Sequence, residues 1–126
     1  MTIQVTVIHG DLVLKKDTTY NNSIRVEGDI VGKDGQRYDL YVNGDIEAMS
    51  IEVGNITSRG STNAWNINTG DITAFDINVI ENIQAGGEII ADFILCESLI
   101  QPEGKKLVCK NLIEKRSTYK LKEVKR

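Results

Sequence analysis

The chain has 126 residues, of which 40% are hydrophobic and 26% are charged, and this size and composition are typical of one globular domain. The sequence contains no run of about 18 apolar residues that would cross a membrane, and its N-terminus lacks the pattern of a signal peptide. We therefore expect a single soluble domain over residues 1–126, located in the cytoplasm and not associated with a membrane.

The formal net charge of −3 at pH 7 conceals an uneven distribution. Residues 105–126 hold nine of the 15 basic residues and only two of the 18 acidic residues, so residues 1–104 are strongly acidic. This asymmetry favours head-to-tail self-association, or the binding of different partners at an acidic face and a basic end. A solvated basic tail beside a solvated acidic body explains the same distribution.

Residues 1–43 are predicted to form an N-terminal cap and irregular coils. Hydrophobic and polar residues alternate over residues 3–7, which indicates an initial strand. A step of Gly-Asp followed by Leu or Ile begins at Gly10, Gly28 and Gly44. A strand cap is expected here because the open end of a stack of β-coils is an exposed sheet edge.

Residues 44–101 carry a repeat of about five residues. Each unit has an isoleucine or leucine and a small residue two positions later. The residue immediately before the isoleucine or leucine is usually Asp, Asn, Ser or Glu. The step of 11 residues from Ile56 to Ile67 equals two units plus one residue, so we expect a degenerate unit between them. The repeated aliphatic residues are Ile46, Ile51, Ile56, Ile67, Ile72, Ile77, Ile83, Ile89, Ile94 and Leu99.

A period of five fits neither an amphipathic helix nor a long flat strand, whose periods are about 3.6 and about 2. It is typical of a coil that turns a corner in every unit, because Gly, Asn and Asp favour bends. The aliphatic and small residues would point inward and stack in columns. The sequence therefore predicts an all-β fold, a β-solenoid (β-helix) with coils of about 20 residues.

Grouping four units in each coil stacks Ile46, Ile67 and Ile89 in one column. In this register a glycine lies in the coil next to Trp65 and another lies next to Phe75, as close packing of a large ring requires. We therefore expect both aromatic side chains to lie within the stack. If they were exposed instead, they would be anchors for a partner.

Residues 102–126 follow the last repeat and are predicted to form a basic C-terminal cap or tail. The alternation of Tyr119 and Leu121 with charged residues indicates a half-buried strand. A short capping helix is the alternative for this segment.

The segment Ala-Trp-Asn-Ile-Asn-Thr-Gly-Asp-Ile-Thr-Ala-Phe-Asp-Ile-Asn at residues 64–78 resembles small proteins of bacteriophages and prophages of Gram-positive bacteria. Those proteins carry tandem units of the type Ala-Trp/Gly/Phe-Asn/Asp-Ile-Asn, and the resemblance covers about residues 44–99. It implies a phage protein that acts in the cytoplasm of a host cell.

Two more distant resemblances suggest other functions. The repeat is similar to that of pentapeptide-repeat proteins, although here the small residue follows the large one; this resemblance implies a four-sided coil and, in some members, mimicry of DNA. The Gly-Asp-Ile steps resemble those of bactofilins, which implies a self-assembling scaffold.

The sequence has few residues suited to catalysis. His9 with Asp11 is the one candidate acid/base pair, and His-Gly-Asp at a strand end is more often a turn. Cys96 and Cys109 lie among apolar residues and are expected to be reduced and buried. The acidic residues lack the register of calcium-binding solenoids, so we expect a protein that is not an enzyme and has no cofactor and no metal.

Two charged sets are candidates for binding partners. An outward acidic stripe would resemble the phosphates of a DNA duplex, and the alternative is that its members are turn residues. A basic set would hold the phosphates of a nucleic acid or nucleotide, or pair with the acidic body of a second copy. The acidic set is Asp45, Glu47, Glu52, Asp71 and Asp76, and the basic set is Lys105, Lys106, Lys110, Lys115, Arg116, Lys120 and Lys122.

These observations together favour a non-enzymatic, phage-type binding protein that forms a homo-oligomer. Its predicted target is a host protein, such as a component of an anti-phage defence system. The alternatives are a self-assembling structural scaffold and a protein that binds a nucleotide signal.

Overall fold

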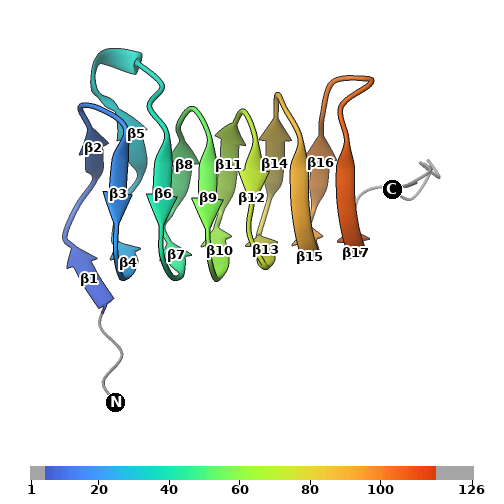
Figure 1. Cartoon of the computed structure of the whole chain (residues 1–126), viewed down its shortest axis with the longest axis horizontal. Coiled ribbons are helices and arrows are strands. Elements are labelled where there is room, and N and C mark those ends of the chain that lie inside the picture. Colours follow the sequence, from blue (N-terminus) through green and yellow to red (C-terminus); the bar gives the residue numbers. More distant parts are fainter. Residues whose placement is uncertain (1–4, 116–126) are drawn as a thin grey trace.

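The computed structural model describes residues 5–115, which form a three-sided solenoid of parallel β-strands (Figure 1). Each coil contributes one short strand to each of three rows, and the chain makes about six turns of roughly 17 residues. The predicted all-β solenoid is therefore confirmed. Among the described residues, no helix is long and apolar enough to cross a membrane.

We number the three sides of the solenoid as faces 1, 2 and 3 in the order in which the chain visits them. Face 1 contains β1 (Val5–Ile8), β4 (Ser23–Val26), β7 (Ile46–Glu47), β10 (Ser61–Ala64) and β13 (Asp76–Val79). Face 2 contains β2 (Leu12–Leu14), β5 (Ile30–Gly32), β8 (Ser50–Glu52), β11 (Asn66–Thr69), β14 (Asn82–Ala85) and β16 (Ser98–Ile100). Face 3 contains β3 (Thr18–Tyr20), β6 (Leu40–Val42), β9 (Ile56–Ser58) and β12 (Ile72–Thr73).

Two longer strands, β15 (Ile89–Cys96) and β17 (Leu107–Glu114), pass around a corner. The first half of β15 pairs with β12 on face 3 and its second half pairs with β13 on face 1, and β17 follows β15 along its whole length. A short 3-10 turn at Lys33–Gly35 lies between β5 and β6. The three corners are named after the faces that they join, as corners 1/2, 2/3 and 3/1.

The register shows that three repeat units form one coil, so the predicted grouping of four units is wrong. Ile51, Ile67 and Ile83 are paired in successive coils of face 2, 16 residues apart. Ile46 and Ile67 therefore lie on different faces. The local period of five residues is the same for three or four units, and only the pairing between coils distinguishes them.

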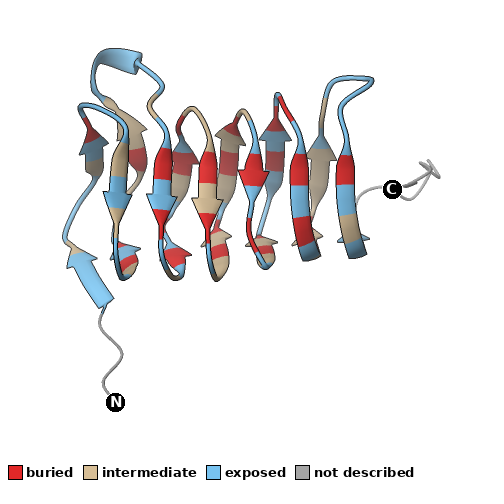
Figure 2. Cartoon of the chain, viewed as in Figure 1, coloured by how far each residue is buried: buried red, intermediate tan, exposed pale blue. Residues whose placement is uncertain are grey.

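The core consists of inward side chains in columns, one column of large aliphatic residues on each face. Figure 2 shows the buried residues as bands that recur on successive strands. The central residues of these columns, such as Ile46, Ile72 and Ile83, are completely buried. Each coil brings three such residues together at the axis, and this shared burial stabilises a coil that could not bury its apolar side alone.

The degenerate unit expected between Ile56 and Ile67 is the strand β10. Thr62 takes the place of an aliphatic residue in the column of face 1 and is paired with Ile46 on one side and Ile77 on the other. Its side chain is completely buried, and its Oγ1 has no hydrogen-bond partner within residues 5–115.

Side-chain oxygens at the corners accept backbone N–H groups from the next coil. At corner 2/3, Asn55 Oδ1 accepts the N–H of Asp71 at 2.8 Å, and Asp71 Oδ1 accepts the N–H of Glu88 at 2.8 Å. At corner 3/1, Asp45 Oδ1 accepts the N–H of Ser61 at 2.8 Å. Corner 1/2 has bonds of the same kind. These bonds explain why Asp and Asn precede so many of the repeated isoleucines.

The glycine in the Gly-Asp-Ile step also has a packing role. Gly28, which begins such a step, and Gly87, which precedes Glu88-Ile89, lie against the carboxylates of Asp11 and Asp71 in the preceding coil, where a Cβ would overlap an oxygen. Glycine is therefore required by close approach, and the Gly-Asp-Ile step marks a corner of the coil.

The two ends agree in part with their predictions. The predicted initial strand is present as β1, although its first residues lie outside the described part of the chain. Residues 107–114 form the strand β17, which supports a strand and not a short helix in this part of the C-terminal cap. Tyr119 and Leu121 lie outside the described residues.

Candidate functional site

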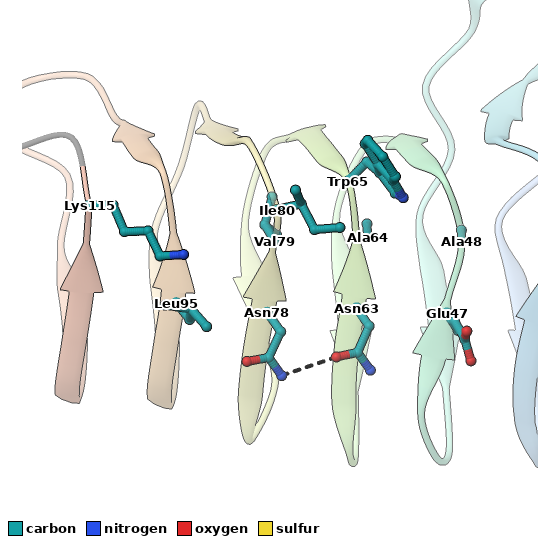
Figure 3. Close-up of a pocket in the computed structure, with 10 residues that line it drawn as sticks. All are labelled: Glu47, Ala48, Asn63, Ala64, Trp65, Asn78, Val79, Ile80, Leu95 and Lys115. Carbon is teal, nitrogen blue, oxygen red and sulfur yellow. Dashed lines mark hydrogen bonds between the residues drawn. The ribbon is translucent and has the colours of Figure 1, made fainter.

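A groove of about 380 Å³ crosses the outside of face 1 beside corner 1/2 (Figure 3). At its base lie Ala48, Ala64 and Val79, which belong to the buried core. Residues from five coils line it, so the groove runs along the solenoid and not along the strands. The complete lining is Glu47, Ala48, Asn63, Ala64, Trp65, Asn78, Val79, Ile80, Leu95 and Lys115.

One wall of the groove is a row of outward side chains on successive strands. Asn63 and Asn78 are paired in the register, and Asn78 Nδ2 donates a hydrogen bond to Asn63 Oδ1 at 3.0 Å. This bond fixes both carboxamides. Within the described residues it leaves Nδ2 of Asn63 and Oδ1 of Asn78 for a ligand.

The other wall is formed by Trp65 and Ile80, whose exposed fractions are 45% and 57%. The expectation that Trp65 and Phe75 lie within the stack is wrong, since Phe75 is 60% exposed. With three units per coil, the position two before each isoleucine falls on a corner and points outward. The backbone confirms this placement, because the N–H of Trp65 donates to Met49 O at 2.7 Å.

Ile80 is an additional residue at corner 1/2. Ile67 comes five positions after Thr62, whereas Ile83 comes six positions after Ile77. Thr62 is nevertheless paired with Ile77, and Ile67 with Ile83. The coil accommodates the insertion without losing its pairing, because Ile80 N donates to Ala64 O at 3.1 Å. The fold does not need this side chain, so its apolar character is informative about binding.

The two titratable residues of the lining lie at opposite ends of the groove (Figure 3). Glu47 Oε1 is 3.3 Å from Arg25 Nε, and both side chains are exposed. Lys115 reaches over Leu95 at the other end. The groove therefore combines an apolar wall, a row of fixed amides and one charge of each sign at its ends.

The structure distributes the predicted acidic stripe over different parts of the surface. Asp45 and Asp76 lie at corner 3/1 two coils apart, and Asp71 lies at corner 2/3. Glu47 points outward from face 1, and Glu52 points outward from face 2, where its Oε2 is 3.5 Å from Arg37 Nη2. The five residues do not form a single stripe, and Asp45 and Asp71 have the bonds of turn residues.

A different acidic row lies along corner 2/3. Asp39 N donates to Asp17 Oδ1 at 2.9 Å, and Asn55 Nδ2 donates to Asp39 Oδ1 at 3.1 Å. Asp71 and Glu88 continue the row in the next two coils. Sequence analysis missed this row because its members lie side by side only when three units form a coil. In the sequence they share one feature: each directly precedes the first residue of a face 3 strand.

The members of the predicted basic set that fall within residues 5–115 surround the last coil. Lys105 and Lys106 precede β17 at corner 2/3, and Lys115 lies in the groove at corner 1/2. Lys110 lies where β17 bends, with Nζ 4.0 Å from Asp92 Oδ1. Arg116, Lys120 and Lys122 lie outside the described residues.

The residues considered for catalysis lie away from the groove. His9 is exposed, with Nδ1 3.0 Å from Glu27 Oε1. Burial raises the pKa of the Cys96 thiol to about 12, with smaller contributions from the nearby carboxylates of Glu114 and Glu97. Residues 5–115 contain no group of three or more His, Cys, Asp or Glu side chains arranged to hold a metal ion.

The chain has no significant match among protein-family models, curated proteins or solved structures.

Proposed function

We propose that this protein is a non-enzymatic binding protein that holds a partner protein in the groove between Trp65 and the Asn63–Asn78 pair. The carrying observation is the exposure of Trp65 and Ile80, two large apolar side chains that the solenoid does not need for folding. Aromatic residues in a partly enclosed site are the usual anchors of protein interfaces. The amides of Asn63 and Asn78 would fix the orientation of the bound chain.

The resemblance of residues 64–78 to phage proteins supports a host protein as the partner. A phage-encoded protein acting in the host cytoplasm would meet components of the host's defence, and a rigid solenoid offers a preformed surface for them. Inhibition of such a component is therefore the function that we propose.

The experiment is affinity purification of the full chain from a Gram-positive host lysate, with mass spectrometry and a direct affinity measurement on the recovered partner. We expect Trp65→Ala to weaken binding about 30-fold or more, since truncation of an anchor costs about 2 kcal/mol or more. Deletion of Ile80 should have a similar effect while leaving the coil paired.

The matched control is Ile100→Ala, which removes a side chain that is 52% exposed on face 2, away from the groove. A partner that is lost equally with both variants, or with neither, would refute the role of the groove. Thermal unfolding of all variants shows whether the fold is retained.

A self-assembling scaffold is a second candidate, supported by the last coil. Leu99 and Leu112 are in register with fully buried residues of the preceding coils, Ile83 and Ile94, but are only partly buried themselves. Stacking of another copy on this end would bury them further. This candidate predicts filaments in negative-stain micrographs at micromolar concentration, and a small closed oligomer in light scattering would exclude it.

A further inference from the structure

Face 3 carries an outward column of side chains that contains no charged residue. The register places one such residue in each of six successive coils, and all six are β-branched or aromatic. The column consists of Thr19, Tyr41, Thr57, Thr73, Ile90 and Val108. Tyr41, Ile90 and Val108 are exposed.

The other two faces differ in this respect. The outward column of face 1 includes Arg25 and Glu47. The outward column of face 2 includes Glu52, whose Oε2 is 3.5 Å from Arg37 Nη2. Charged residues are the usual choice on a sheet that faces water, whereas strands with apolar residues on both sides are typical of sheets covered on both faces. Face 3 therefore has the composition of a sheet that packs against another layer.

The two borders of face 3 differ in the middle coils, where an arginine is present at one border only. Asp39, Asn55 and Asp71 lie side by side at corner 2/3, where the strands of face 3 begin. Arg59 directly follows β9 at corner 3/1, where these strands end, and the same corner carries Asp45 and Asp76 where the face 1 strands β7 and β13 begin. Phe75 follows β12 at the same border and extends the apolar surface.

We propose that face 3 is the interface of a homodimer in which two solenoids pack face to face and run in the same direction. The two-fold axis then lies parallel to the solenoid axis, so corner 2/3 of one copy faces corner 3/1 of the other. Arg59 lies opposite the partner's Asn55, between the carboxylates of the partner's Asp39 and the partner's Asp71.

Arg59 distinguishes this arrangement from the other two-fold arrangement of the same faces, in which the solenoids run in opposite directions. That arrangement places each corner against itself, which brings Asp39 near the partner's Glu88 and Asp17 near the partner's Lys106. Arg59 then faces the partner's Phe75 and not a carboxylate. In the parallel dimer Glu88 approaches the partner's Asp92, but the carboxylate of Asp92 already has Lys110 Nζ at 4.0 Å. The parallel dimer also brings Lys106 near the partner's Lys110, so it is the contacts of Arg59 with the partner's Asp39 and the partner's Asp71 that favour this direction.

The size of face 3 sets the expected strength of the dimer. Six coils about 4.8 Å apart, each with about five residues of chain along this face, cover about 29 Å by about 17 Å. Two such faces bury about 1,000 Å² in total, the lower limit for a specific interface. We therefore expect a dissociation constant in the micromolar range and not an obligate dimer.

Sedimentation velocity of the full chain over a range of micromolar concentrations tests the proposal. We expect a monomer–dimer equilibrium, and we expect Ile90→Lys to raise the dissociation constant at least about ten-fold by placing a charge in the contact. The matched control is Ile100→Lys, because Ile90 and Ile100 are 44% and 52% exposed on different faces. A monomer at all concentrations, or equal effects of both variants, would overturn the proposal.

The same experiment separates this interface from the groove. Trp65→Ala should leave the dimer unchanged, because Trp65 lies at corner 1/2. A dimer that is lost with Trp65→Ala but retained with Ile90→Lys would refute the use of face 3 and would assign self-association to the groove.

Cross-linking determines the direction of the two solenoids. In the parallel dimer a Thr19→Cys residue lies opposite its own copy, whereas in the antiparallel dimer it lies opposite position 108 and about 24 Å from its copy. We expect Thr19→Cys alone to form a cross-linked dimer with a short thiol-specific reagent. Cross-linking only between Thr19→Cys and Val108→Cys chains would overturn the parallel arrangement, and the wild-type chain serves as the blank for Cys96 and Cys109.

Discussion

Asp71 Oδ1 accepts the backbone N–H of Glu88 at 2.8 Å, and the glycine before Glu88 lies directly against the same carboxylate. One side chain thus satisfies an amide of the next coil while a glycine leaves space for it. The Gly-Asp-Ile steps of the sequence follow from this arrangement, which recurs at all three corners.

Gly87→Ala is expected to destabilise the solenoid, whereas Gly86→Ala is not. A Cβ at Gly87 would overlap Asp71 Oδ1, while one at Gly86 meets only Thr69 O at 3.8 Å. Overpacking costs about 1–3 kcal/mol, and a compatible Gly→Ala change can gain about 0.4–1 kcal/mol through the unfolded chain. Urea unfolding of both variants measures the difference, and equal stabilities would show that the corner does not need glycine.

Asp71→Asn should leave the stability nearly unchanged, and Asp71→Ala should lower it by about 1–2 kcal/mol. Asn55 makes the same bond in the preceding coil through a neutral carboxamide, so the corner needs an acceptor and not a charge. Thermal unfolding of the two variants tests this. If Asn were as damaging as Ala, the negative charge itself would be the stabilising feature.

Thr62→Val is expected to raise the free energy of unfolding by about 1 kcal/mol. The hydroxyl of Thr62 is buried without a partner in residues 5–115, and valine has nearly the same shape. Thr69→Val is the control: Thr69 is also buried, but its Oγ1 donates to Gly54 O at 3.0 Å, so this variant should be destabilised. Stabilisation of both variants, or of neither, would contradict this difference.

The stability of the fold should decrease in alkaline solution partly because of Cys96. Burial raises the pKa of this thiol from 9.0 to about 12. Below pH 9 the thiol is protonated in both states, but between pH 9 and pH 12 the unfolded chain loses the proton first, so rising pH favours unfolding. Unfolding midpoints at about pH 8 and about pH 10.5 should differ more for the wild-type chain than for Cys96→Ala.

Much of the fold could be predicted from the spacing of aliphatic residues alone. Isoleucine every five residues, with Asp or Asn before it, indicated short strands and corners, and the long step from Ile56 to Ile67 indicated the degenerate unit at Thr62. These predictions succeed because the direction of a side chain within one strand and the bend that follows it depend on neighbouring residues.

The candidate site was less predictable. Glu47 and Lys115 were selected from the sequence as charged residues, but the apolar wall was not, because Trp65 was assigned to the core. The insertion of Ile80 is visible in the sequence as a step of six residues. Whether the additional side chain lies in a groove depends on the residues beside it in the neighbouring coils, and only the register between coils identifies those residues.

The sequence by itself determined that this chain winds into stacked β-coils with isoleucine inside and with glycine, Asp and Asn at the bends, since these features arise from interactions within about one repeat unit. Only the tertiary structure decided that a coil has three sides, that Trp65 and Phe75 are exposed, and that the uncharged column of face 3 lies on one surface. Pairing between residues about 16 positions apart determines all three features, and a period of five residues is compatible with more than one such pairing.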